Sequence, residues 1–155
     1  MTHVPLKELP EFVRNAMAVL ALNRDNTKAV VVTLKGELGS GKTTFVQTLA
    51  RELGVTDSVQ SPTYVLMKIY RLPEGLNRIG QPRRFKKLVH IDAYRLEKPE
   101  QFAALKPEEF LHDPEVLVCI EWPERVEAVL PKPDLGINFS SEKMEEGERS
   151  IEIKK

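Results

Sequence analysis

Apolar residues gather in short runs that predict buried strands. Residues 29–34 are apolar and rich in β-branched side chains, and residues 88–92 form another short run with Leu88, Val89 and Ile91 apolar. Residues 116–120 are apolar at successive positions, not alternate ones. That pattern is typical of a parallel strand covered on both faces, so we expect residues 116–120 at the centre of a sheet.

Two longer segments repeat their apolar residues at helical spacing. They are Leu9–Leu22 and residues 44–53, and Gly54 stands where a C-terminal cap of the second helix belongs. Shorter helical turns are expected at Pro99–Leu105 and at residues 107–111. Helices alternating with buried strands predict an α/β fold.

Further strands are expected toward the edges of the sheet. Residues 63–70 are expected to pair with residues 88–92 as an antiparallel hairpin, joined by the long connection 71–87. Other short strands are expected near the two ends of the chain, in Thr2–Pro5, residues 135–139 and residues 150–153. We expect all these elements to form one domain that spans residues 1–155.

A glycine-rich turn joins the first buried strand to the second helix. Gly36 and Gly41, five positions apart, are followed by Lys42 and Thr43, which is the phosphate-loop pattern. Glycines let backbone N–H groups turn toward a polyphosphate, Lys42 adds a cation, and the Thr43 hydroxyl can ligate Mg²⁺. The strand–loop–helix context favours nucleotide binding over a chance match. The residues expected to contact the nucleotide are Glu37, Leu38, Gly39, Ser40, Gly41, Lys42, Thr43 and Thr44.

The composition restricts the setting of the protein. Its 155 residues carry 23 Lys and Arg against 23 Asp and Glu, and this balance gives no argument for nucleic acid or a membrane surface. The single cysteine, Cys119, excludes an intramolecular disulfide and is expected to be a buried hydrophobe. No apolar run is long enough to span a bilayer, and the first residues do not resemble a signal peptide, so we expect a cytoplasmic protein.

Two acids end predicted strands and are candidates for a metal site. Asp92 follows Leu-Val-His-Ile, and Glu121 follows Leu-Val-Cys-Ile. Mg²⁺ takes hard oxygen ligands and usually keeps waters, so one or two carboxylates suffice. The continuous apolar run before Glu121 favours a central strand next to the loop strand, so we favour Glu121 as the carboxylate that faces Mg²⁺, directly or through water. Asp92 is then expected one strand away, where it holds a metal-bound water or orients the attacking one.

Three further residues near these acids are open to more than one interpretation. Thr63 follows Ser61-Pro62, and its hydroxyl either senses the terminal phosphate, as switch segments do, or bonds locally at the start of a strand. His90 lies within its strand and is expected to be structural. Trp122, directly after Glu121, either packs under the site, as we expect, or stacks on a partner.

The connection 71–87 is basic, with six Lys and Arg against one acid. It is either a solvated loop or a contact for an acidic protein surface or an RNA backbone. The chain lacks the Asn-Lys-x-Asp stretch with which guanine-specific GTPases read their base, and this favours ATP. Besides an ATPase, the pattern leaves open a small-molecule kinase and a binding module that uses nucleotide only as a switch.

Four motifs follow one another along the chain. They are Gly36-Glu-Leu-Gly-Ser-Gly-Lys-Thr-Thr-Phe45, Ser61-Pro-Thr-Tyr64, His90-Ile-Asp-Ala-Tyr-Arg-Leu96 and Glu121-Trp-Pro123. Together they resemble the TsaE family, small bacterial ATPases of the tRNA threonylcarbamoyladenosine pathway. The resemblance covers roughly residues 9–139, and its last three motifs are more specific together than the phosphate loop alone.

The resemblance implies a phosphate-loop NTPase fold of three layers, with a central parallel sheet flanked by antiparallel strands. It also implies Mg²⁺-dependent ATP hydrolysis in the service of two partners, TsaD and TsaB, which modify the adenosine beside the tRNA anticodon; tRNA would be met indirectly, through that complex. By motif, Lys42 and Thr43 hold phosphate and metal. Glu121 belongs to the metal site, Asp92 is needed for hydrolysis, and Thr63 sits in a switch-like segment.

Overall fold

The computed structural model describes residues 2–22, 25–75, 84–140 and 148–154, and its centre is a sheet of seven strands. The strands are β1 (Thr2–Pro5), β2 (Val30–Lys35), β3 (Met67–Arg71), β4 (Lys87–Asp92), β5 (Val116–Glu121), β6 (Leu135–Ser140) and β7 (Glu148–Lys154). The α-helices are α1 (Leu9–Leu22), α2 (Lys42–Leu53) and α3 (Glu108–Leu111). Short 3₁₀ helices are η1 (Leu6–Glu8), η2 (Pro99–Leu105), η3 (Pro123–Arg125) and η4 (Glu127–Val129).

The strand order across the sheet is β1-β7-β6-β2-β5-β4-β3. The four inner strands β6, β2, β5 and β4 are mutually parallel, whereas β7 and β1 on one side and β3 on the other pair antiparallel. The predicted central parallel sheet with antiparallel flanks is therefore confirmed. The strand β5 lies between β2 and β4, as the continuous apolar run in its sequence predicts.

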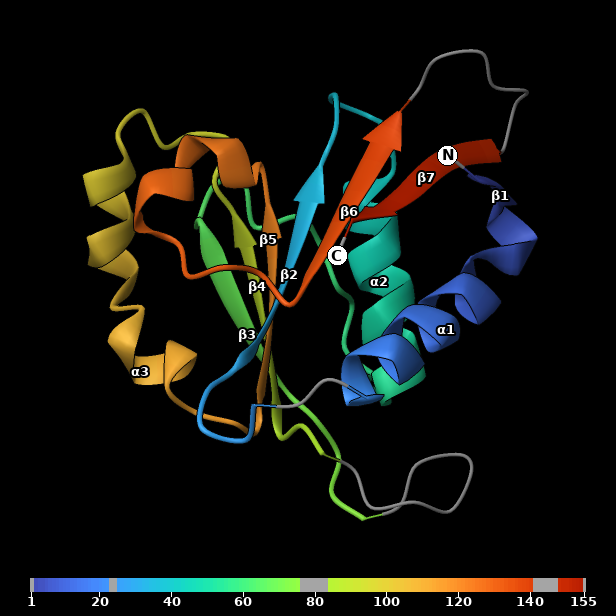
Figure 1. The fold of residues 1–155 in the computed structure, drawn as a ribbon, viewed down its shortest axis with the longest axis horizontal. Coiled ribbons are helices and arrows are strands. Elements are labelled where there is room, and N and C mark those ends of the chain that lie inside the picture. Colours follow the sequence, from blue (N-terminus) through green and yellow to red (C-terminus); the bar gives the residue numbers. More distant parts are fainter. Residues whose placement is uncertain (1, 23–24, 76–83, 141–147, 155) are drawn as a thin grey trace.

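Helices cover both faces of the sheet and give the predicted three layers (Figure 1). On one face, α1 and α2 pack through residues such as Val13 and Phe45 against Val32 and Leu117. On the other face, η2 and α3 pack against the opposite side of the same strands. Two separate apolar clusters result, one on each side of the sheet, because successive residues of a strand point to opposite faces. This is the phosphate-loop NTPase architecture.

The hairpin of β3 and β4 is confirmed, but its first strand is shorter than predicted. We expected a strand over residues 63–70, and the structure begins β3 only at Met67. The carbonyl of Pro62 accepts hydrogen bonds from the N–H groups of Val65 and Leu66, and Leu66 has a φ of 65°. This turn holds residues 63–66 out of the sheet. The tip of the basic connection, residues 76–83, lies outside the described residues.

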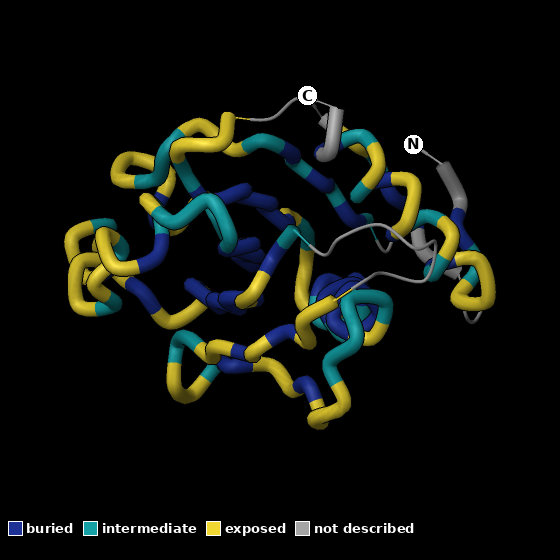
Figure 2. The backbone as a smooth tube through the Cα atoms, turned by 90° about the horizontal axis from the view of Figure 1, so that it is seen from below, coloured by how far each residue is buried: buried dark blue, intermediate teal, exposed yellow. Residues whose placement is uncertain are grey.

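Buried residues concentrate along the inner strands and the facing sides of α1 and α2, as Figure 2 shows. Cys119 is fully buried in β5, as predicted, and burial raises the pKa of its thiol. Gly54 caps α2 with a φ of 93°, again as predicted. None of the helices in the described part of the chain is long and apolar enough to cross a membrane.

Candidate functional site

The glycine-rich loop lies between β2 and α2, at the edge where the parallel strands end (Figure 1). Ligands of open α/β sheets commonly bind at this edge. The loop passes so close to β6 that a Cβ atom on Gly36 would come within 2.5 Å of the Phe139 carbonyl oxygen. Gly41 caps the N-terminus of α2 with a φ of 103°, a conformation that glycine adopts without steric cost. Both glycines are therefore required by the path of the chain.

The side chain of Lys42 curls back over the loop that precedes it. Its ammonium donates to the carbonyl oxygens of Gly36 and Glu37, at 2.7 and 2.8 Å. It also lies 4.1 Å from the centre of the Trp122 ring. Burial lowers the pKa of Lys42, and the nearby carboxylates of Glu121 and Asp92 oppose that shift. The backbone of the loop thus holds the Lys42 ammonium where a bound phosphate would lie.

Glu121 connects the end of β5 to the start of α2. Its Oε1 accepts a hydrogen bond from the Thr43 hydroxyl at 2.9 Å and lies 2.8 Å from Nε2 of His90. The side chain is only 3% exposed, so these bonds compensate for removing a carboxylate from water. Thr43 and Glu121, both predicted candidates for the metal site, therefore lie in direct contact. His90 is a residue of this site that the sequence interpretation had left as structural.

Asp92 lies beside Glu121, opposite it in the parallel pairing of β4 with β5. One of its carboxylate oxygens, Oδ2, accepts hydrogen bonds from the hydroxyls of Thr63 at 2.5 Å and Ser61 at 3.2 Å. The other, Oδ1, accepts from the backbone N–H of Tyr94 at 2.9 Å. The segment around Thr63 therefore contacts Asp92 directly. The second interpretation of Thr63 is right in one part: its hydroxyl bonds locally, 2.7 Å from that of Ser61, but Thr63 does not begin a strand.

Aromatic residues surround the mouth of the loop. The rings of Trp122 and Tyr94 are 5.0 Å apart, and the guanidinium of Arg95 lies 4.5 Å from the ring of Tyr64. Trp122 has a φ of 58°, and its N–H donates to the carbonyl of Leu34 at the end of β2. The chain thus turns sharply after β5, and the turn places the indole over Lys42. Trp122 packs at the site, as predicted, but its ring lies beside the Lys42 ammonium and not underneath the site.

Most of the predicted site residues come together at this edge of the sheet. Lys42, Thr43, Asp92, Glu121 and Thr63 belong to one connected group of hydrogen bonds and close contacts. Four predicted contact residues are placed by the loop itself: Leu38 and Glu37 are exposed, Leu38 to 78%, Ser40 is buried, and Thr44 is half-buried. Ser61 and His90 complete the group and were missed. His90 lies two residues from Asp92 on β4, which on a strand means the same face, and Ser61 lies two residues from Thr63 in the turn.

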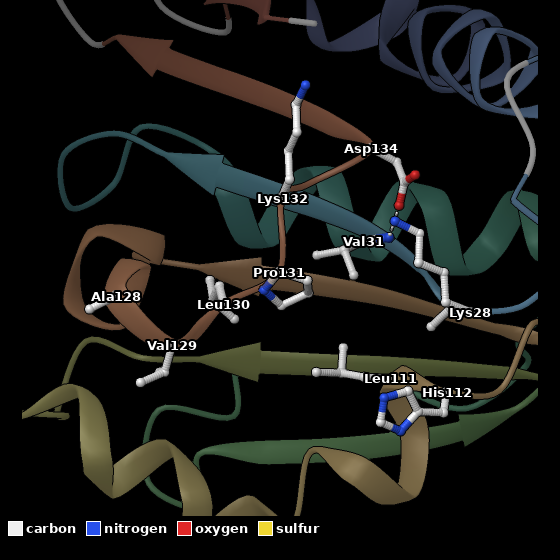
Figure 3. Close-up of a pocket in the computed structure, with 11 residues that line it drawn as sticks. Lys28, Val31, Leu111, His112, Ala128, Val129, Leu130, Pro131, Lys132 and Asp134 are labelled. Carbon is white, nitrogen blue, oxygen red and sulfur yellow. Dashed lines mark hydrogen bonds between the residues drawn. The ribbon is translucent and has the colours of Figure 1, made fainter.

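A pocket of about 390 Å³ lies at the other end of the sheet, away from this group. Figure 3 shows that it is lined by the segment before β2, the end of α3 and residues 128–134. Its floor is apolar, and Asp134 at its edge accepts a hydrogen bond from the N–H of Val31 at 2.9 Å. No residue of the loop or of the acidic group lines it, so the catalytic candidates are elsewhere.

The sequence model of one protein family matches most of the chain. Residues 8–151 fit the family described as "Threonylcarbamoyl adenosine biosynthesis protein TsaE". The chain belongs to the TsaE family. All four motifs identified in the sequence fall within the matched residues.

Curated TsaE proteins of several bacteria resemble the chain over most of its length. The protein from Nostoc is 37% identical over 86% of this chain and 75% of its own, and the one from Haemophilus influenzae is 31% identical over 79% and 70%. The TsaE protein of Bacillus subtilis is 34% identical over 75% and 72%. These relatives are named as proteins of tRNA threonylcarbamoyladenosine biosynthesis.

The fold resembles a solved structure. The crystal structure of YdiB from Bacillus subtilis superposes with a TM-score of 0.60, covers 92% of this chain and 77% of its own, and is 27% identical in sequence. The match supports the phosphate-loop NTPase fold.

The residues at the loop fit a magnesium-bound triphosphate. Gly36 and Gly41 allow the tight turn of the loop, and the Lys42 ammonium lies against its backbone carbonyls. Thr43, Glu121 and Asp92 offer hard oxygens of the kind Mg²⁺ prefers. Among the described residues no group of three or more His, Cys, Asp and Glu side chains forms a metal centre by itself. Mg²⁺ typically binds to one or two carboxylates together with substrate phosphates, and this site offers that arrangement.

Proposed function

We propose that this protein is a Mg²⁺-dependent ATPase whose ATP cycle serves the enzymes that form threonylcarbamoyladenosine in tRNA. One observation carries the proposal. The acids at the ends of β4 and β5 lie side by side in register, one bonded to the phosphate-loop hydroxyl of Thr43 and the other to the Thr63 hydroxyl of a neighbouring turn. A phosphate loop alone indicates binding, whereas two buried acids at its mouth supply the groups that hydrolysis needs.

Each residue has a definite part in this proposal. The loop at Glu37, Leu38, Gly39, Ser40, Gly41 and Thr44 cradles the phosphates through its backbone. Lys42 neutralises the outer phosphates, and these new charge-assisted bonds would compensate for its release from the carbonyls of Gly36 and Glu37. Asp92 orients the attacking water.

The metal would be held by the Thr43 hydroxyl and by Glu121, directly or through water, with Asp92 nearby. When bound, Mg²⁺ neutralises the charge that develops on the phosphate oxygens. Thr63 links the state of the nucleotide to the turn at residues 62–66, because its hydroxyl already bonds Asp92. A change at Asp92 on hydrolysis would therefore be transmitted to the exposed side chains of Tyr64 and Val65.

The membership of the TsaE family connects this site to tRNA modification. We propose that the partners are TsaD and TsaB, that the ATP cycle sustains turnover of their complex, and that tRNA is reached through that complex. The exposed aromatic and apolar side chains beside the site, Tyr64, Val65 and Tyr94, are suited to contact a protein partner.

Reconstitution tests the proposal. The purified protein is mixed with the TsaD and TsaB counterparts of the same organism and with tRNA, with and without ATP. We expect an ATP-dependent complex and repeated rounds of tRNA modification. Without complex formation and without multiple turnover, the proposal would be abandoned.

Analysis of the products of ATP separates hydrolysis from the alternatives. Phosphate released to water supports the ATPase, whereas a phosphorylated metabolite would indicate a kinase. The variants Lys42→Ala and Glu121→Ala are both expected to lose hydrolysis, and Lys42→Ala also loses most of its phosphate affinity. Full partner-dependent activity in both variants would instead indicate a binding module that does not depend on hydrolysis.

A further inference from the structure

His90 occupies a fully buried position directly beneath the candidate metal site. It lies on β4 opposite Cys119 of β5, so Glu121, two residues further along β5, is its diagonal neighbour on the same face of the sheet. Its Nε2 lies 2.8 Å from Oε1 of Glu121. The imidazole therefore contacts the carboxylate from below, on the side away from solvent.

The chemistry of this contact fixes the direction of the hydrogen bond. A carboxylate oxygen only accepts, so Nε2 of His90 carries the proton and donates it. The same oxygen of Glu121 accepts from the Thr43 hydroxyl at 2.9 Å. Donors from β4 and from α2 thus converge on one oxygen. Because the Thr43 hydroxyl donates its hydrogen to Glu121, the lone pairs of its oxygen remain available to bind a metal ion.

The surroundings of His90 do not otherwise favour a polar side chain. Its neighbours on the same face, Leu88 and Cys119, belong to the apolar cluster under α1 and α2. The second ring nitrogen, Nδ1, is buried and has no hydrogen-bond partner among the described residues. A buried polar atom without a partner is destabilising. An apolar residue would fill this space without that cost, and it would lose only the bond to Glu121.

We propose that His90 is a positioning residue for the metal site. Its Nε2–H holds Glu121 in the orientation that keeps the Thr43 hydroxyl directed for Mg²⁺. This inference rests on the proposed Mg²⁺-dependent ATP site. The proposed role of His90 is in metal binding and not in folding. Its effect can therefore be measured as a change in the Mg²⁺ dependence of ATP binding, without any hydrolysis.

The test compares ATP affinity with Mg²⁺ and with EDTA, measured by calorimetry on the wild-type protein and two variants. His90→Leu fills the space without a donor, whereas His90→Gln places an amide N–H near the position of Nε2. All three proteins are expected to bind ATP equally in EDTA. The Mg²⁺ concentration needed for tight binding should rise about tenfold or more in His90→Leu, the effect typical of losing a hydrogen bond to a metal ligand, and stay near the wild-type value in His90→Gln.

Urea unfolding of each variant serves as the control for folding. If His90→Leu does not fold, His90→Asn replaces it, because its shorter amide reaches the position of Nδ1 and not that of Nε2. Wild-type Mg²⁺ dependence in a folded variant without the donor would overturn this inference and leave the proposed function intact. A wild-type protein whose ATP affinity ignores Mg²⁺ would overturn both.

Discussion

The strands β4 and β5 present two faces that differ in chemistry although their residues alternate along the same chain. On the face toward α1 and α2 lie Leu88, His90 and Asp92 of β4, and on β5 the corresponding residues end in Glu121. On the opposite face the buried side chains are apolar, as Val89, Ile91, Val118 and Ile120 show, and the charged Lys87 at the start of β4 is exposed. Adjacent residues therefore differ in role: Asp92 belongs to the candidate site, whereas Ile91 belongs to the apolar core.

The two faces of β4 and β5 differ because they pack against different elements. The face toward α2 runs into the N-terminus of that helix, where Thr43 offers a hydroxyl to Glu121. The opposite face packs on η2 and α3 through Phe102 and Phe110, which offer only apolar surface. A carboxylate is tolerated in a buried position only where donors are present. The site can therefore form on one face alone, and only where the strands end.

The largest effect is expected from Asp92→Asn. The amide keeps the size of the side chain and removes its charge, so ATP hydrolysis should fall about 10²- to 10⁴-fold, the usual contribution of a positioned proton acceptor. ATP affinity should change little. The matched control is Ile91→Val, one residue away on the other face, which should hydrolyse ATP at the wild-type rate. A hydrolysis rate in Asp92→Asn within a few-fold of wild type would break the assignment.

On the apolar face, Ile120→Ala tests stability. Ile120 is fully buried, so the substitution leaves a cavity and should lower the free energy of unfolding by about 2–5 kcal/mol. Urea denaturation measures this loss. Glu121→Gln, the neighbouring residue on the other face, keeps its volume and should cost clearly less. If the two variants were equally unstable, the division between the faces would not hold.

Lys42→Met separates binding from folding. Each charge-assisted hydrogen bond to a phosphate contributes about 1.5–3 kcal/mol, so ATP affinity should fall roughly 10- to 150-fold in a calorimetric titration. The fold should be kept, because methionine fills the same space.

The pH dependence of stability gives a second measure of Lys42. Because burial lowers the pKa of this lysine, the folded state disfavours its charged form, and wild-type stability should rise as pH increases toward the ordinary lysine value of 10.5. Lys42→Met should lack that part of the rise. An identical profile for both proteins would show that the ammonium is not desolvated.

The smallest effect is expected at Cys119, which shares a face with Glu121 but belongs to the apolar cluster. Cys119→Ala should cost about 1 kcal/mol and leave ATP hydrolysis unchanged. Since burial raises the pKa of the thiol, the folded protein keeps it protonated, and wild-type stability should fall as pH rises above the ordinary value of 9.0. Cys119→Ala should lose that decline. Rapid labelling of the folded protein by a thiol reagent would contradict the burial.

Most strands, the loop and the resemblance to the TsaE family could be predicted from the amino-acid sequence. Continuous apolar runs indicated the buried strands, and glycine spacing with Lys42 and Thr43 indicated the phosphate loop, because both depend on residues close in the chain. The prediction that Glu121 and Asp92 lie on adjacent strands also succeeded, since β5 is the most continuously apolar strand after β2. These inferences required only local pattern and the rule that such strands occupy the centre of a sheet.

The contacts between side chains of different elements could be learned only from the three-dimensional fold. The length of β3 depended on a turn closed by the Pro62 carbonyl, and a strand-like sequence cannot reveal that competing hydrogen bond. The link from Thr63 to Asp92 joins residues 29 positions apart, and that from His90 to Glu121 joins residues 31 apart. Such contacts depend on strand register and on which face meets α2. The sequence therefore determined the chemical groups of this site, and the register of β4 with β5 determined how they are connected.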